Sequence, residues 1–178
     1  MKIVKRIALF LVAFVALALI VALFVNGEYA VERQVTINKP KQEVFAYVKL
    51  LKNQNNYSKW ASLDPQMKTS FNGTDGTVGF VSSWEGNKDV GKGEQKIIKI
   101  TEGERIDYEL HFIEPIESTE QAYMITEAVN GNQTKVKWGF EGRMKYPMNL
   151  MCLFMDMDDM VGPDFEQGLS NLKALMEK

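Results

Sequence analysis

The sequence has little of the chemistry that marks metal and disulfide proteins: one cysteine and one histidine among 178 residues. One cysteine excludes an internal disulfide framework and a cysteine-rich zinc site. One histidine excludes sites built on several histidines, such as His-Glu-x-x-His. We therefore expect no metal and no other cofactor.

Acidic residues are absent before Glu28, and the first 25 residues differ from the rest of the chain. The remaining 153 residues contain 18 basic and 23 acidic side chains, a net charge of −5. Binding to a phosphate backbone requires a basic surface, so nucleic acid is not an expected partner. A segment of this length suits one domain with its own core.

A run of 19 apolar residues extends from Ile7 to Val25. As a helix it would span about 28 Å, close to the hydrocarbon thickness of about 30 Å. A cleaved signal peptide has a shorter apolar region and a small-x-small cleavage site, which Val25-Asn26-Gly27 matches weakly. A core helix would have a polar face. The sequence predicts a membrane anchor over residues 1–27, crossing with residues 7–25, and one domain over residues 28–178.

Basic residues precede the apolar run, whereas Asn26, Gly27 and Glu28 follow it. The positive-inside tendency then predicts a single-pass protein with a cytosolic N-terminus and an extracytoplasmic domain. Because Asn26-Gly27 is the only break, the domain should lie close to the membrane surface.

Hydrophobic periodicity after Gly27 alternates between strand and helix patterns. Residues 28–37 read as a half-buried strand, with Arg33 an exception on its apolar face. Helical patterns follow over 40–52 and in a short turn at Tyr57 and Trp60. Five further strands are predicted over residues 77–84, 94–101, 105–112, 118–129 and 133–141. Two closing helices are predicted over 148–160 and 164–177, separated by Gly162-Pro163. This order predicts an α+β fold with a largely antiparallel sheet.

Several short motifs have ordinary structural explanations. Gly86 to Lys92 resembles a phosphate-binding loop but is followed by Gly93 where Ser or Thr is needed, which favours a hairpin turn. The acidic residues at 156–159 lack the glycine of a calcium loop. His111 falls on a polar strand face and Cys152 in an apolar helix, so neither is expected to be catalytic, and we assign no catalytic residue.

Apolar side chains on the predicted strand and helix faces suggest a ligand wall. Six of the ten methionines fall within residues 144–160, where they could serve ordinary core packing or form an adaptable surface for an apolar ligand. Aromatic residues recur on the apolar strand faces. The candidate ligand-binding residues are Trp84, Tyr108, Phe112, Trp138, Phe140, Met151, Met155, Phe165 and Leu169.

Short residue patterns in a fixed order run through most of the chain after the anchor. They are Ile37-x-x-Pro40-x-x-x-Val44-Phe45, Asn56-Tyr57-x-x-Trp60, Val78-Gly79-x-x-x-x-Trp84, Gly91-x-Gly93-Glu94, Thr134-x-Val136-x-Trp138-x-Phe140 and Asp164-Phe165-Glu166-x-Gly168-Leu169-x-Asn171-Leu172-Lys173. Their order resembles the SRPBCC (START/Bet v 1-like) superfamily, in particular bacterial polyketide cyclase/dehydrase-like proteins. The resemblance implies a helix-grip fold, in which a curved antiparallel sheet wraps around a long C-terminal helix, with an apolar cavity between the two. That superfamily contains lipid carriers, receptors, cyclases and oxygenase subunits, so the fold does not decide the function.

Three functions remain open at this point. The first is membrane-tethered binding of a lipid or other hydrophobic small molecule between the sheet and the C-terminal helix. The second is a polyketide cyclase-like enzyme, with Tyr108, Tyr123 or Arg33 as the polar groups of the cavity. The third is an interaction module whose cavity is collapsed. A convergent acid/base pair in the cavity would favour the enzyme, and a smooth apolar cavity would favour the carrier.

Overall fold

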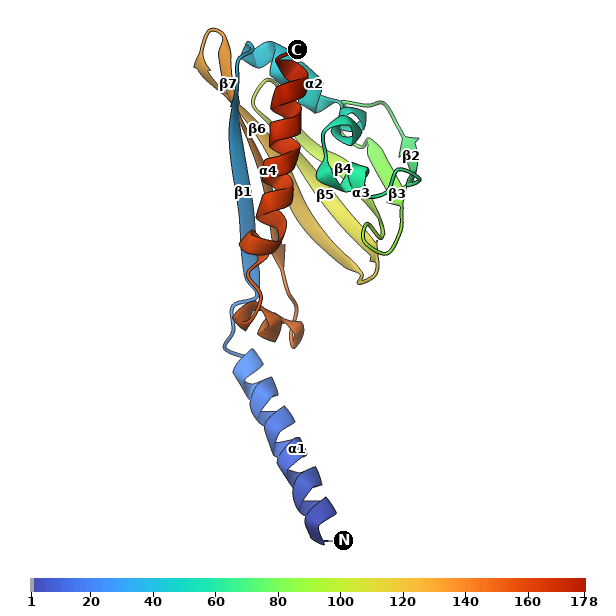
Figure 1. The fold of residues 1–178 in the computed structure, drawn as a ribbon, viewed down its shortest axis with the longest axis vertical. Helices are drawn as coiled ribbons and strands as arrows, with labels where there is room; N and C mark the ends of the chain where they lie inside the picture. Colours follow the sequence, from blue (N-terminus) through green and yellow to red (C-terminus); the bar gives the residue numbers. More distant parts are fainter. Residues whose placement is uncertain (1) are drawn as a thin grey trace.

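The computed structural model describes residues 2–178. One antiparallel sheet of seven strands curves around a long C-terminal helix, in the order β1-β7-β6-β5-β4-β3-β2 (Figure 1). The strands are β1 (Glu28–Ile37), β2 (Lys68–Asn72), β3 (Val81–Glu85), β4 (Lys92–Thr101), β5 (Arg105–Glu114), β6 (Ser118–Asn130) and β7 (Gln133–Arg143). The helices are α1 (Lys2–Ala22), α2 (Lys41–Lys49), α3 (Lys59–Leu63) and α4 (Met157–Met176), with 3-10 turns η1 (Leu51–Asn56) and η2 (Met148–Leu153). The expected α+β helix-grip architecture is confirmed.

The core lies between the concave face of the sheet and α4. In α4, Phe165, Leu169 and Leu172 follow one another at helical spacing and are all buried. The Phe165 ring stacks on Trp138 of β7, with centroids 4.8 Å apart and planes 12° apart. Burial of such side chains is the main stabilising term for a domain of this size.

Helix α4 differs from the sequence prediction in where it begins and in having no break at Gly162-Pro163. Predicted helices over 148–160 and 164–177 are replaced by η2 and a single α4 that runs through Gly162-Pro163. Asp156 caps the helix, because its carboxylate accepts from the Asp158 backbone N–H at 2.8 Å. Pro163 removes one backbone hydrogen bond, but the tertiary packing of α4 outweighs the loss.

The ion pairs of Arg33 explain why a charged side chain lies on the apolar face of β1. Its guanidinium forms ion pairs with Asp158 at 2.6 Å and Glu166 at 2.7 Å, both on α4. The hydrogen bonds from Arg33 hold the pKa of Asp158 below its usual range. A cation on the helix-facing side of β1 therefore fastens α4 to the edge of the sheet.

Smaller differences concern strand limits. The predicted strand 77–84 begins only at Val81, since residues 77–80 form a turn closed by Phe80 N–H and Thr77 C=O at 3.2 Å. Strand β2 was missed because all of its residues are exposed. The poor alternation of β4 reflects a bulge between Ile97 and Lys99. The predicted helix 40–52 is divided into α2 and η1.

Helix α1 extends away from the sheet and α4 (Figure 1). An 18-residue stretch of this helix has a mean hydropathy of 2.5, and none of that stretch is buried. Within residues 2–178 it is the one helix long and apolar enough to cross a membrane. The helix ends at Ala22, three residues before the end of the apolar run.

Candidate functional site

A cavity of about 490 Å³ lies between the concave face of the sheet, α3 and the first half of α4. Five of the nine predicted ligand-binding residues line it: Trp84, Phe112, Trp138, Phe140 and Phe165. Its volume falls in the range of about 300–1,000 Å³ that is usual for small-molecule sites. Exposed residues at its rim include Asn55 of η1, Thr69 of β2, Lys88 and Asp89 of the β3–β4 loop, and Glu114 and Pro115 at the end of β5.

The aromatic side chains of this wall form two groups of contacting rings. Trp84 meets Phe112 edge-on with centroids 5.9 Å apart, and Phe112 meets Phe140 edge-on at 6.4 Å. On the α4 side, Trp60 meets Trp138 at 6.0 Å and Phe165 at 5.5 Å, again edge-on. Edge-to-face packing holds aromatic rings in fixed positions. Contacting aromatic rings therefore form much of the cavity wall.

One end of the cavity carries a pair of polar side chains, Glu120 of β6 and Tyr29 of β1. Glu120 is only 8% exposed. The Tyr29 hydroxyl lies beside it, and the Arg143 backbone N–H donates to Glu120 Oε2 at 3.3 Å. Both side chains lie over Gly142, where any Cβ would collide with the Glu120 carboxylate and the Tyr29 ring. A glycine at this position lets the two polar groups meet.

Burial changes the acidity of this pair. It raises the pKa of Glu120 above the ordinary carboxyl value, an effect that the Arg143 backbone N–H and the Tyr29 hydroxyl partly oppose. Burial, and then the nearby Glu120, raise the pKa of Tyr29. The pair therefore favours its protonated forms more strongly than the same groups would in water.

Sequence reasoning missed Glu120 and Tyr29 as site residues. The signal was present for Glu120, because it is in phase with Ala122 and Met124, which face the core from β6. A glutamate on the apolar face of a strand is an informative exception.

The other four predicted residues lie elsewhere. Tyr108 and Leu169 are 1% exposed and belong to the packed core, and neither borders the cavity. Met151 and Met155 precede α4, which begins at residue 157 and not at 148 as predicted. Met157 and Val161 of α4 occupy the wall in their place.

The polar groups proposed for an enzyme are also outside the cavity. Arg33 contacts α4 as described above, and the Tyr123 hydroxyl donates to Glu32 Oε2 at 2.7 Å on the outer face of the sheet. His111 lies beside Glu94 and Glu117, and Cys152 is in η2. The expectation that Arg33, Tyr123 or Tyr108 supplies the polar groups of the cavity is wrong, since Glu120 and Tyr29 hold that position.

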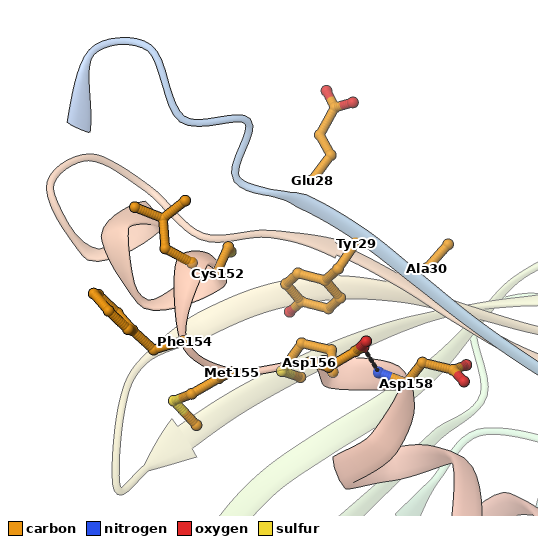
Figure 2. A pocket seen from close by; sticks show the side chains of 10 residues that line it. Glu28, Tyr29, Ala30, Cys152, Phe154, Met155, Asp156 and Asp158 are labelled. Atoms are coloured by element: carbon orange, nitrogen blue, oxygen red, sulfur yellow. Dashed lines mark hydrogen bonds between the residues drawn. The ribbon is translucent and has the colours of Figure 1, made fainter. Parts of the chain in front are cut away.

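A second hollow, of about 520 Å³, lies on the outside of the molecule, where β1 begins (Figure 2). Figure 2 shows the Tyr29 ring extending from β1 toward the segment that carries Met155 and Asp156. This hollow is open, and Tyr29, Cys152, Met155 and the carboxylates of Glu28, Asp156 and Asp158 line it. Among residues 2–178, no group of three or more His, Cys, Asp or Glu side chains could hold a metal ion.

Comparison with known proteins places these features in a family. The family described as "Polyketide cyclase / dehydrase and lipid transport" matches residues 29–177. No curated protein sequence matches the chain.

Solved structures share the fold at low identity. A point mutant of norcoclaurine synthase from Thalictrum flavum, in complex with a transition-state analogue, is similar with a TM-score of 0.61 and 11% identity over 85% of this chain and 95% of that one. Ara h 8.0201 is similar with a TM-score of 0.57 and 16% identity over 84% and 98%. Protein CV1439 from Chromobacterium violaceum has a TM-score of 0.59 and 13% identity over 84% and 97%.

The family match covers the whole sheet and α4, and the similar structures share their arrangement. The chain therefore belongs to the polyketide cyclase/dehydrase and lipid transport family of the SRPBCC superfamily.

Proposed function

We propose that this protein holds one hydrophobic small molecule in the cavity between the sheet and α4, in a domain that α1 tethers to a membrane. The observation that carries the proposal is the hollow of about 490 Å³, whose wall is largely aromatic and also includes the buried Glu120 carboxyl beside the Tyr29 hydroxyl. A mostly apolar pocket with a few placed polar groups is the usual form of a small-molecule site. The family description, which includes lipid transport, agrees with a ligand of this class.

The polar end of the cavity narrows the chemistry of the ligand. The Tyr29 hydroxyl offers an O–H donor, and Glu120 offers one in its protonated form, which burial favours relative to water. A ligand carboxylate would lie next to the buried Glu120. The one cationic side chain among the cavity-lining residues is Lys88, at the rim, so a carboxylate at the polar end would have no cationic partner there. The arrangement favours an apolar molecule that ends in a neutral oxygen acceptor, such as a carbonyl, a hydroxyl or an ester.

The same pair supports a second candidate function, catalysis on a bound polyketide-like substrate. A carboxyl group with a raised pKa next to a tyrosine hydroxyl can exchange a proton with a carbonyl oxygen. Glu120→Gln distinguishes the two functions. A carrier keeps most of its affinity, because glutamine still offers a donor, whereas an enzyme loses about 10²-fold or more of its rate.

The proposed tethering rests on the apolar composition of α1 and on the basic residues in its first turns. A reporter that is active only outside the cytosol, fused after Lys178, should be active if the positive-inside tendency sets the orientation. An inactive reporter in a membrane-bound chain would reverse the orientation. N-terminal sequencing of the mature chain that starts near Glu28 would replace the anchor with a cleaved signal peptide.

The chain carries its own reporter for ligand binding, because all three of its tryptophans, Trp60, Trp84 and Trp138, line the cavity. A brominated long-chain alcohol added to the full chain in detergent should quench their fluorescence in a saturable way. Ala122→Leu places a larger side chain on the cavity wall and should weaken the quenching, while Ala174→Leu, exposed on α4, should leave it unchanged. Equal, unsaturable quenching in all three proteins would refute binding in the cavity.

A further inference from the structure

The connection between α1 and the sheet is fastened by hydrogen bonds. The Asn149 side-chain amide of η2 donates to the Ala22 carbonyl at 2.7 Å and to the Val25 carbonyl at 2.9 Å, so it satisfies the last carbonyl of α1 and one in the connection that follows. The Met144 backbone N–H donates to the Gly27 carbonyl at 2.9 Å, and a Cβ at Gly27 would collide with the Met144 carbonyl. Residues 23–27 therefore do not act as a free linker, and η2 is held at the end of α1.

The segment 145–154, which we call the η2 segment, has an inverted distribution of polar and apolar side chains. Its asparagine, Asn149, is buried at 6% exposure, whereas Met148, Leu153 and Phe154 are 50%, 55% and 86% exposed. In Figure 2, Phe154 points away from Tyr29 and β1. A turn that faces water has the opposite arrangement.

The exposed apolar side chains of the η2 segment continue the apolar surface of α1. Leu23 and Phe24, directly after the end of α1, are also exposed, and η2 contacts α1. Two exposed cations lie here: Lys145 is the first residue of the η2 segment, and Arg143, which is 3.9 Å from Glu28, is at the end of β7. Exposed aromatic and aliphatic groups with flanking cations are typical of segments that lie at the boundary between headgroups and acyl chains.

We propose that the η2 segment lies in the interfacial layer of the same bilayer that α1 crosses, as a second membrane contact that fixes the orientation of the domain. This inference rests on the proposed tethering by α1. The bilayer is the occupant that the geometry favours, because the end of α1 already places η2 at the depth of the headgroups. Met148, Leu153 and Phe154 are then covered by lipid and not by water.

Site-directed nitroxide labelling of the full chain in phospholipid vesicles tests the contact. The native thiol is removed by Cys152→Ala, and single labels are placed by Leu11→Cys, Phe154→Cys and Asn132→Cys. Position 11 reports the α1 segment, position 154 the η2 segment, and position 132 the β6–β7 turn at the far end of the sheet. All three native residues are exposed, so a label should not disturb the fold.

Each label is exposed in turn to oxygen, which concentrates in lipid, and to a water-soluble nickel chelate. We expect oxygen accessibility to exceed nickel accessibility at positions 11 and 154, and the reverse at position 132. A label at 154 that behaves like the one at 132, while 11 is in lipid, overturns the membrane contact but leaves the tether intact. A water-accessible label at 11 overturns the tether itself. A label at 154 that neither reagent reaches indicates a protein contact, such as a second copy, and also overturns the proposal. Labels at Leu153→Cys and Met148→Cys guard against a local effect at one position.

Discussion

Truncation of one cavity-lining phenylalanine should separate a ligand wall from an ordinary core. Phe112 of β5 borders the cavity, whereas Phe80, just before β3, is 1% exposed and fully packed. Phe80→Ala should cost about 3–5 kcal/mol of unfolding free energy, the usual loss for a core phenylalanine. Phe112→Ala should cost about half as much, because one side of its ring already faces the hollow and has few contacts to lose.

The two variants should also differ in binding. Phe112→Ala removes part of the aromatic series between Trp84 and Phe140, so the quenching by the brominated alcohol should weaken. Phe80→Ala should leave quenching by the folded protein nearly unchanged. The unfolding free energies come from urea titration of the full chain in detergent, followed by circular dichroism of the sheet. Equal stability losses in the two variants, with unchanged quenching in Phe112→Ala, would show that Phe112 is a core residue and would refute the reasoning.

Three further perturbations address the polar end of the cavity and the fastening of α4. Because burial raises the pKa of Glu120, the folded state binds its proton more tightly than the unfolded state, so wild-type stability should fall as the pH rises from the ordinary carboxyl pKa through the raised one. Glu120→Gln should remove that fall and be the more stable protein at pH values above the raised pKa. Urea titrations at several pH values measure the difference. An unchanged pH profile in the variant would contradict the burial of an ionisable Glu120. Gly142→Val should cost about 1–3 kcal/mol and weaken ligand quenching, since its side chain displaces Glu120 and Tyr29; wild-type stability and quenching would contradict their placement. Arg33→Met should lower stability only modestly at neutral pH, because the carboxylates that pair with Arg33 are exposed. The difference from wild type should shrink as the pH falls through the lowered pKa of Asp158. A difference that persists at acidic pH would assign the effect of Arg33 to packing.

The order of elements was accessible from the sequence because the strands of the sheet alternate strongly. Tyr29, Val31, Val35 and Ile37 share one face of β1 with period two, and the structure keeps that face toward α4. The limits of α4 were not accessible, since the stripe of apolar residues continues from Met148 into α4 and conceals the break after η2. The cap at Asp156 is a local interaction that decides the boundary and that the apolar pattern does not reveal.

The residues of the candidate site also differ in whether a local sequence pattern could predict them. Aromatic residues on the inner face of the strands, such as Trp84 and Phe112, could be placed at the cavity from periodicity alone. Tyr108 shares the face of Phe112 on the same strand, yet it is packed in the core beyond the end of the hollow, because periodicity gives the face but not the depth along the sheet. Glu120 and Tyr29 meet only through the register of β1 with β7 and of β7 with β6, which no local pattern encodes.

The central claim is that the hollow beneath α4 is occupied by one hydrophobic molecule, and native mass spectrometry of the full chain released from detergent micelles tests it most directly. We expect the wild-type protein and Ala174→Leu to carry a bound species of one defined mass that is extractable into organic solvent. Ala122→Leu, with its larger side chain in the cavity wall, should lose that species while remaining folded. A wild-type chain that emerges without any bound molecule, and that gains none from a panel of long-chain alcohols, isoprenoids and polyketides, would contradict the claim.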